Sequence, residues 1–234
     1  EFEKNERNVR KAVADFGLTY PVMQDNDFAT WRAYDNHYWP AKYFIDKNGV
    51  VRSTHFGEGG YDESERMIQE LLGETGTDVT DAISNPVPPE NDANTPESYL
   101  GYGRLTRFVS PERVARNVPT SYSVPKTIPG NGLAYGGTWT VTEEYAHPES
   151  GSELVLSFNA KEVYIVAQPN GAGGTMRIFV DGAEQAPGAD VRAGTVTVSD
   201  DRLYHLVSLP SAGAHTLRIL FENGYANVFA FTFG

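Results

Sequence analysis

The apolar positions of the chain follow two different periods. Before residue 74 they recur at helical spacing or in short runs, whereas after residue 96 they mostly alternate with polar positions. The stretch between them loses both patterns and is rich in Gly, Thr, Asp, Asn and Pro. We therefore expect two domains, at residues 1–73 and 97–234, joined by a Pro-rich linker at residues 74–96.

The first part predicts a mixed α/β order. A helix is expected over residues 3–16, with Asn5 as its N-cap and Gly17 as its stop. A short strand is expected over residues 19–25, followed by a brief helix capped by Asp27. A last helix is expected to begin at Asp62 with a capping-box-like pattern and to end at Gly73.

Between these helices lies the strongest local signal of the chain, a hairpin. Pro40 stands directly before the apolar run 41–45, then Asp46 to Gly49 read as a turn, and a second run covers about residues 50–56. Asn48-Gly49 is a favoured hairpin dipeptide because both residues tolerate positive φ. Pro40 cannot donate to a sheet ladder, so we place it at the start of its strand and expect a cis peptide bond before it.

The second part predicts an all-β domain. Its alternating runs each put one apolar face inward, and Asn170-Gly171, Asp181-Gly182 and Asn223-Gly224 are turn dipeptides between them. The spacing favours an antiparallel sandwich or jelly roll. The expected runs are Leu154-Leu156-Phe158, Val163-Ile165-Ala167, Met176-Ile178-Val180, Leu217-Ile219-Phe221 and Phe229-Phe231-Phe233.

Charge and cysteine content exclude several functions. The chain carries a net charge of −12, of which −8 lies in residues 1–90 and −4 in the rest, so neither half offers a basic surface for nucleic acid or anionic lipid. It has no cysteine, which excludes disulfides, thiolate metal sites and cysteine nucleophiles within this chain. No run is long enough to span a membrane. Because residue 1 is Glu, we expect a piece of a larger protein.

Metal and glycosidase chemistry find little support in the residues. The five histidines lack zinc-site spacing, and no cofactor motif occurs, so we expect neither a metal nor a cofactor. Asp181, Asp200-Asp201 and Glu143-Glu144 could supply oxygen ligands to Ca²⁺, although turn and surface roles are favoured. Glu143 and Glu144 are adjacent, so on a strand they point to opposite faces and cannot flank one glycosidic bond.

Sugar binding would use aromatic faces with a few polar side chains beside them. The richest stretch runs from Asn131 to Thr140, with Tyr122 before it. We expect Tyr135 to be exposed in a Gly-rich loop, whereas strand parity favours a buried Trp139. Asn223 and Tyr225 form a second loop cluster. The carbohydrate-binding candidates are therefore Tyr135, Trp139, Tyr122, Asn223 and Tyr225.

The hairpin and its neighbours resemble a known family. The string from Trp39 to Arg52, together with Tyr20-Pro21-Val22 and Phe56-Gly57-Glu58-Gly59, resembles the C-terminal half of a TlpA-type thioredoxin-like domain and, more closely, the DipZ family. Residues 97–234 look like that family's C-terminal module, a jelly roll of the galactose-binding or carbohydrate-binding type. The resemblance covers the chain on both sides of the linker.

The resemblance implies a thiol-disulfide oxidoreductase of the disulfide-interchange and cytochrome c biogenesis type. Its Cys-x-x-Cys would lie upstream of these residues, so this chain alone is not expected to be redox-active. Its implied partners are the upstream half of its own thioredoxin-like domain, a membrane domain, thiol or disulfide protein substrates and envelope carbohydrate. Its implied location is extracytoplasmic and membrane-tethered.

The resemblance also assigns a role to two residues of the hairpin. Pro40 would be the cis-proline at the rim of the redox site, and the backbone of Trp39 would pair with an extended substrate. Without the resemblance, Trp39 is expected to fill the core, as buried aromatic residues commonly do. The rival function is a non-catalytic docking module that binds protein or carbohydrate.

Overall fold

The computed structural model describes residues 2–77, 79, 82–83, 93–184 and 188–234. The chain divides into two compact units. The hairpin unit is Val13–Glu90, and the sandwich unit is Glu1–Ala12 together with Asn91–Gly234. Much of the predicted linker, including residues 84–92, lies outside the described residues, so the boundaries 1–73, 74–96 and 97–234 stay predictions.

The first helix forms where the sequence predicts it, in two pieces. A 3₁₀ turn, Phe2–Lys4, precedes α1, which spans Glu6–Asp15. The N-cap prediction is confirmed, because Asn5 Oδ1 accepts the backbone N–H of Arg7 at 3.0 Å. Gly17 follows the helix with a φ of +60°, which matches the predicted stop.

The predicted hairpin is confirmed. Strand β1 spans Ala41–Ile45 and pairs antiparallel with β2, Val51–Phe56. The turn between them is held by Asp46, whose Oδ1 accepts the N–H groups of Asn48 and Val50 at 2.9 and 3.0 Å. Only Gly49 of the expected dipeptide adopts positive φ, at +81°. The loop is longer than a two-residue turn because the carboxylate takes over part of its hydrogen bonding.

Both remaining helices begin differently from the prediction. Helix α2 spans Ala29–Ala33, and the carboxylate of Asp25, rather than Asp27, accepts the N–H groups of Thr30 and Trp31 at 2.9 and 2.8 Å. These two donors lower the pKa of Asp25 below its ordinary value. The reason for the error is that the chain folds back before the helix, so a residue two positions earlier reaches its amides.

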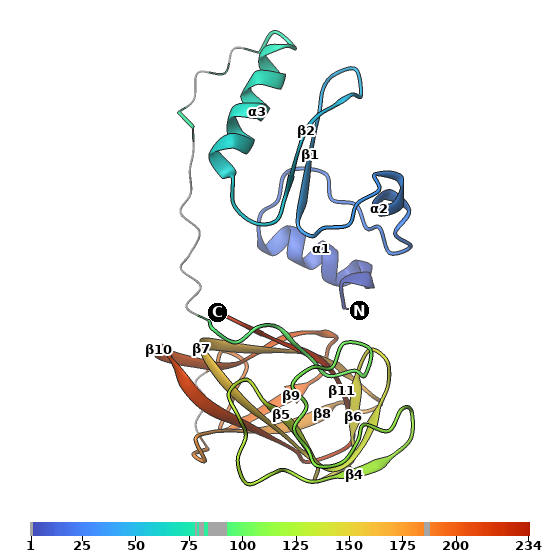
Figure 1. The fold of residues 1–234 in the computed structure, drawn as a ribbon, viewed down its shortest axis with the longest axis vertical. Helices are drawn as coiled ribbons and strands as arrows, with labels where there is room; N and C mark the ends of the chain where they lie inside the picture. The colour runs from blue at the N-terminus through green and yellow to red at the C-terminus, as the bar shows by residue number, and fades with distance from the viewer. Residues whose placement is uncertain (1, 78, 80–81, 84–92, 185–187) are drawn as a thin grey trace. The chain divides into compact units, whose positions relative to one another are not determined.

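Helix α3 spans Tyr61–Gly73 and lies along the hairpin (Figure 1). Asp62 does not cap it but lies inside it, with Arg66 at 3.0 Å. The residue before the helix is Gly60, at φ +59°, where a Cβ would lie 2.5 Å from Cε1 of His55. Backbone conformation and crowding both demand glycine here, so the helix starts without a side-chain cap.

The predicted strand over residues 19–25 is wrong. In the described part of the chain this stretch pairs with no other strand. A strand is defined by its ladder, and an apolar run without a neighbouring edge remains irregular. Among the described helices, none combines the length and the apolar character that crossing a lipid bilayer requires.

The sandwich unit is antiparallel, as predicted. Every ladder between its named strands is antiparallel, in the order β3-β11-β6-β5-β7-β10-β8-β9, with β4 beside β5. The strands are β3 Ser98–Tyr99, β4 Thr120–Tyr122, β5 Leu133–Val141, β6 Ala146–Pro148, β7 Glu153–Pro169, β8 Gly174–Val180, β9 Thr195–Val198, β10 Arg202–Phe221 and β11 Ala226–Phe233.

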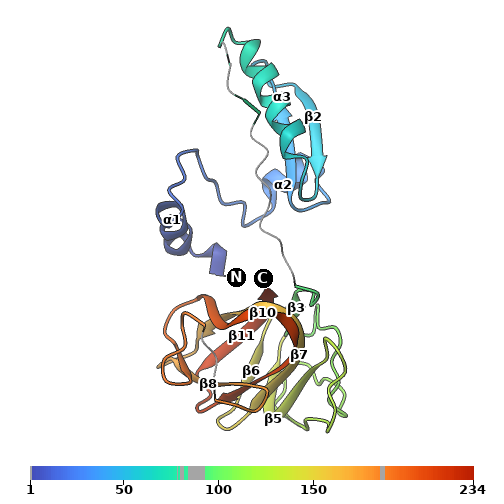
Figure 2. The same cartoon turned by 90° about the vertical axis from the view of Figure 1, so that its left-hand side faces the viewer.

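Two long strands connect the layers of this sandwich. Strands β7 and β10 have 17 and 20 residues and run side by side (Figures 1 and 2). Two of the predicted runs, at residues 154–158 and 163–167, are therefore halves of one strand. The register of the pair shifts between Ser208 and Gly213, so each strand can bend from one layer into the other.

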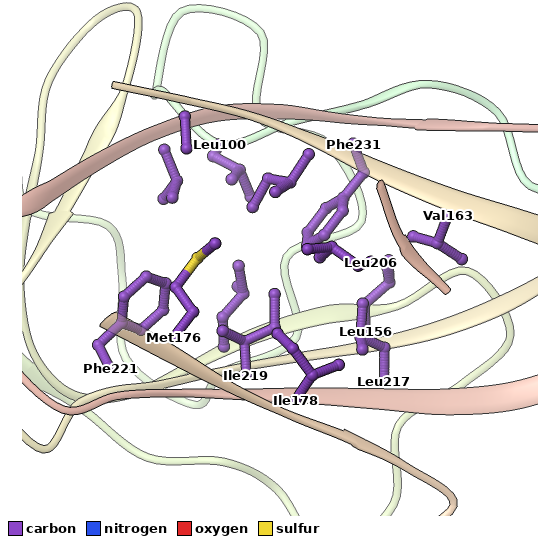
Figure 3. Packing of buried hydrophobic residues seen from close by; sticks show 14 of the residues in the cluster. Leu100, Leu156, Val163, Met176, Ile178, Leu206, Leu217, Ile219, Phe221 and Phe231 are labelled. Carbon is purple, nitrogen blue, oxygen red and sulfur yellow. The ribbon is translucent and has the colours of Figure 1, made fainter. Parts of the chain in front are cut away.

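The core lies between the two layers. Alternate side chains of the strands meet there with almost no exposure, as Figure 3 shows for ten labelled residues. Along β10, Leu217, Ile219 and Phe221 are fully buried while the residues between them are not. This is the period-two burial that the sequence predicts.

The hairpin unit has no comparable core. Of the 17 large hydrophobic side chains that are exposed in the described residues, 15 belong to it. None of its described hydrophobic side chains reaches full burial. Two of the exposed residues are Trp39 and Phe16, at 84% and 76%. An apolar surface of this extent is unusual for a protein that works alone.

We predict opposite effects for two tryptophan substitutions. Trp139 is fully buried, stacks on Tyr135 at 4.5 Å and meets Phe221 at 5.2 Å. Trp139→Ala should lower the free energy of unfolding by about 3–5 kcal/mol because it leaves a large cavity. Trp39→Ala should change it by less than about 0.5 kcal/mol. Urea denaturation followed by circular dichroism measures both, and similar losses in the two variants would contradict the assignment of the core.

Candidate functional site

The first candidate site is the Trp39 turn, residues 36–40, which leads into β1. The peptide bond between Trp39 and Pro40 is cis, as predicted. Asn36 holds the turn from a buried position, because its Nδ2 donates to the carbonyl of Tyr38 at 2.7 Å and its Oδ1 accepts the hydroxyl of Tyr43 at 2.9 Å. Trp39 itself is exposed, so the expectation that it fills the core is wrong for this unit.

Aromatic side chains continue the exposed surface beside the turn. The ring of Tyr38 lies 4.9 Å from that of Phe56, which in turn lies 6.0 Å from Tyr43. Tyr34 meets Tyr43 edge-on at 4.9 Å. The turn therefore presents a continuous aromatic surface rather than one isolated tryptophan.

Strand β1 also has a free edge. In the described residues it pairs only with β2, in a two-stranded sheet. Cavities of about 360 and 510 Å³ lie beside this strand. The first is lined by Met23, Trp31, Tyr34 and Ile45 among others, and the second by Phe44, Ile68, Leu71 and Leu72 among others. Backbone and side chains here can bind another chain segment, but without a cysteine they cannot exchange disulfides.

The second group of candidates lies in the sandwich unit, and three of them are wrong as binding residues. Tyr135 was expected in an exposed loop but is fully buried in β5. Its hydroxyl donates to the carbonyl of Leu100 at 2.6 Å, and burial holds the pKa of its phenol well above the ordinary value. Tyr122 is buried as well, and Trp139 lies in the core, as strand parity favoured.

The glycines around Tyr135 explain the error. Gly136 does not mark a loop, because a Cβ there would lie 2.7 Å from Cγ of Glu153 and 2.8 Å from Cγ2 of Val124. It instead lets two neighbouring segments approach the strand closely. A glycine that serves close packing and a glycine that serves a turn look the same in sequence.

Tyr225 remains an exposed candidate. It lies between β10 and β11 with 49% exposure, and its ring lies over Gly171, where a Cβ would be 3.6 Å from Cδ1 of the ring. Asn223 supports this loop, since its Oδ1 accepts the N–H groups of Thr175 and Tyr225 at 3.2 and 3.4 Å. Asn223 is thus engaged in the loop, and Tyr225 is the side chain that is open to a ligand.

Sheet register adds polar side chains that the sequence analysis missed. The N–H of Asn170 donates to the carbonyl of Tyr225 at 2.8 Å. His147 Nδ1 lies 3.0 Å from Oδ1 of Asn227 and 3.4 Å from Nδ2 of Asn170. We call His147, Asn170, Tyr225 and Asn227 the Tyr225 rim. Only the pairing of β6, β7 and β11 brings its members together.

The carboxylates weighed as Ca²⁺ ligands have other partners. Asp181 binds the ring of His215 at 2.6 Å and the N–H of Thr216 at 2.9 Å, which together lower the pKa of Asp181. Asp200 accepts the hydroxyl of Ser199 at 2.7 Å. Within the described ranges, no three His, Asp or Glu side chains lie close enough together to hold a metal ion.

Comparisons with known proteins place the chain in a family. A family model described as a thioredoxin-like C-terminal domain matches residues 95–234. Protein DipZ of Mycobacterium tuberculosis (strain CDC 1551 / Oshkosh) is 31% identical over 239 residues, which is 100% of this chain and 32% of DipZ. The chain thus spans about a third of that relative's length, and the predicted resemblance to the DipZ C-terminal region is confirmed.

Two further likenesses cover parts of the chain. The thiol-disulfide oxidoreductase YkuV of Bacillus subtilis (strain 168) is 33% identical over 67 residues, which is 29% of this chain and 45% of YkuV. The solved structure of CsCBM6-3 from Clostridium stercorarium in complex with cellobiose is 16% identical over 42% of this chain and 75% of that chain, with a TM-score of 0.25, too low to establish a shared fold. By the model that matches most of its length, this chain belongs to the family of the thioredoxin-like C-terminal domain.

Proposed function

We propose that this chain is the C-terminal part of an extracytoplasmic thiol-disulfide oxidoreductase, of the disulfide-interchange and cytochrome c biogenesis type. One observation carries the proposal: in the described residues, the hairpin unit exposes 15 large hydrophobic side chains and leaves the outer edge of β1 unpaired. An upstream half of a thioredoxin-like domain, carrying Cys-x-x-Cys, would cover most of this surface and leave Trp39 open at its rim. Similarity to DipZ and YkuV supports the same assignment.

The chemistry would be divided between the two halves. The upstream half supplies the thiolate that attacks a disulfide, and this chain supplies the rim at Trp39 and Pro40. An extended protein substrate would pair with the backbone before Pro40 and rest on the side chain of Trp39. The 234-residue chain alone has no thiol and no redox turnover. Upstream segments would also tether the protein to the cell membrane.

We predict that Trp39 matters for protein substrates only. In a longer protein that includes the upstream half, Trp39→Ala should raise KM for reduced or oxidised protein substrates about tenfold, because substrate contacts are lost. Turnover of a small aromatic disulfide should change less than twofold. An insulin-reduction assay beside a small-disulfide assay separates the two effects.

The control for this prediction is Tyr225→Ala, which removes an exposed aromatic side chain from the sandwich unit instead. It should leave both assays unchanged. Redox turnover by the cysteine-free chain itself, or equal effects of the two variants, would refute the assignment of the rim.

We further propose that the sandwich unit binds envelope carbohydrate at the Tyr225 rim. An exposed tyrosine ring can stack on the apolar face of a pyranose. When Nδ1–H of His147 donates to Asn227, its Nε2 is an acceptor for a sugar hydroxyl. The amide of Asn170 adds a donor beside it. The same surface would serve protein docking under the rival function.

We predict that Tyr225→Ala weakens glycan binding at least tenfold, because the stacking face is lost. Tyr225→Phe keeps that face and should stay within about threefold of the unchanged chain. A glycan array identifies ligands, and isothermal titration calorimetry with the strongest one measures the variants. If a broad panel of cell-envelope oligosaccharides shows no binding, the protein-docking function replaces this proposal.

A further inference from the structure

A cavity of the sandwich unit shares no lining residue with the Tyr225 rim. It measures about 550 Å³, within the range of small-molecule sites, and lies between the segment 124–128 and the outer faces of β7 and β10. We call it the Lys126 pocket. Its lining residues include Val124, Lys126, Thr127, Glu153, Thr216 and Arg218.

Strand register explains why charged residues meet at this place. On β10, Arg218 pairs across from Val155 of β7. The intervening residues Leu154 and Leu217 are fully buried in the core, so Glu153, Val155 and Arg218 face outward. Although it faces outward, Val155 is only 6% exposed, and the segment 124–128 lines the same cavity. The pocket is therefore bordered by this segment on one side and by the outer face of the sheet on the other.

The base of the pocket is fixed by close packing and an ion pair. Nε of Arg218 donates to Oε2 of Glu153, and its guanidinium lies 5.1 Å from the ring centroid of Phe179. The lack of a Cβ at Gly136 leaves room for both Glu153 and Val124. Arg218 is consequently held at one position, with its Nη groups directed by the planar guanidinium.

In the described residues, several hydrogen-bond donors of the pocket have no partner. Among the described residues, the Nη groups of Arg218 donate no hydrogen bond, and Lys126 forms neither a hydrogen bond nor an ion pair. Two cationic groups thus face one carboxylate, Glu153, in a chain with a net charge of −12. An anion is the complement of such a site, and a carboxylate matches the two Nη groups of an arginine.

The other lining residues favour an anion that also carries hydroxyl groups on a carbon skeleton. The hydroxyls of Thr127 and Thr216 lie in the wall, and Val124, Pro125 and Ile128 supply apolar contact. The described lining includes no aromatic side chain on which a sugar ring could stack. A ligand here would be recognised by charge and hydroxyl groups, unlike one that stacks on Tyr225.

We propose that the Lys126 pocket binds the carboxylate-bearing sugar of an acidic oligosaccharide, a uronic acid. Lys126 and the Nη groups of Arg218 donate to the sugar carboxylate, and Thr127 and Thr216 contact ring hydroxyls. This site acts in addition to the Tyr225 rim and does not depend on it.

The test titrates the full 234-residue chain with trigalacturonate and with its methyl ester. Trigalacturonate should bind at least tenfold more tightly than the neutral ester, and more weakly as salt rises. Lys126→Gln and Arg218→Gln should each weaken binding of the acid about tenfold. Lys161→Gln, which removes an exposed lysine elsewhere on β7, should leave it unchanged, as should Tyr225→Ala.

Three results would overturn the proposal. The first is equal affinity for the acid and its ester, or binding of neither. The second is equal weakening by Lys126→Gln and Lys161→Gln, which would indicate a general charge effect. The third is full competition by equimolar sulfate, which would indicate an anion site without sugar recognition. Loss of acid binding in Tyr225→Ala would show that the acid binds at the Tyr225 rim and not in the Lys126 pocket. The same variant therefore distinguishes failure of this proposal from failure of the proposed glycan site at the Tyr225 rim.

Discussion

The pairing of β7 with β10 is the constraint on which the sandwich unit depends. The two strands pair over almost their whole lengths and shift register twice, which lets them contribute to both layers. Their inward residues form much of the core, and their outward residues form the base of the Lys126 pocket. The end of β7 also supports the loop that holds Tyr225. Core and candidate binding surfaces are therefore two faces of one ladder, so a change of register by one residue would exchange them.

The hairpin unit differs in this respect, because its described residues form no fully buried core. Asp46, Asn36 and Asp25 fix its turns by side-chain hydrogen bonds to backbone groups. Such bonds set local geometry but bury little apolar surface, and it is burial that supplies most of the free energy of folding. An apolar partner segment would therefore contribute stability and complete the site in the same step.

Local signals in the sequence predicted local structure well. The hairpin, the Asn5 cap and the alternating strands follow from residue types and periods that act over a few positions. The wrong predictions concern residues whose burial or pairing is set by segments that are distant in the sequence. Tyr135 is buried because Gly136 admits Glu153 and Val124, and β7 is one strand because β10 follows it past the expected break. The sequence did not indicate that His147 and Asn170 lie together. They are 23 positions apart, and only the order of the strands places them beside Tyr225.

The surfaces of the two units differ in physical character, and this difference supports separate roles for them. Apolar area without specific polar groups suits permanent association with another part of the same protein, and the surface along the free edge of β1 has that character. Sparse, defined polar groups beside a small hydrophobic area suit reversible binding of a hydrated ligand, and both the Tyr225 rim and the Lys126 pocket have that character. Under the proposed function, a redox domain completed by its upstream half would be kept near the envelope by a glycan-binding module and remain free to meet protein substrates. Under the same proposal, two weak sites on one module would strengthen attachment to a polymeric glycan without slowing release from either site.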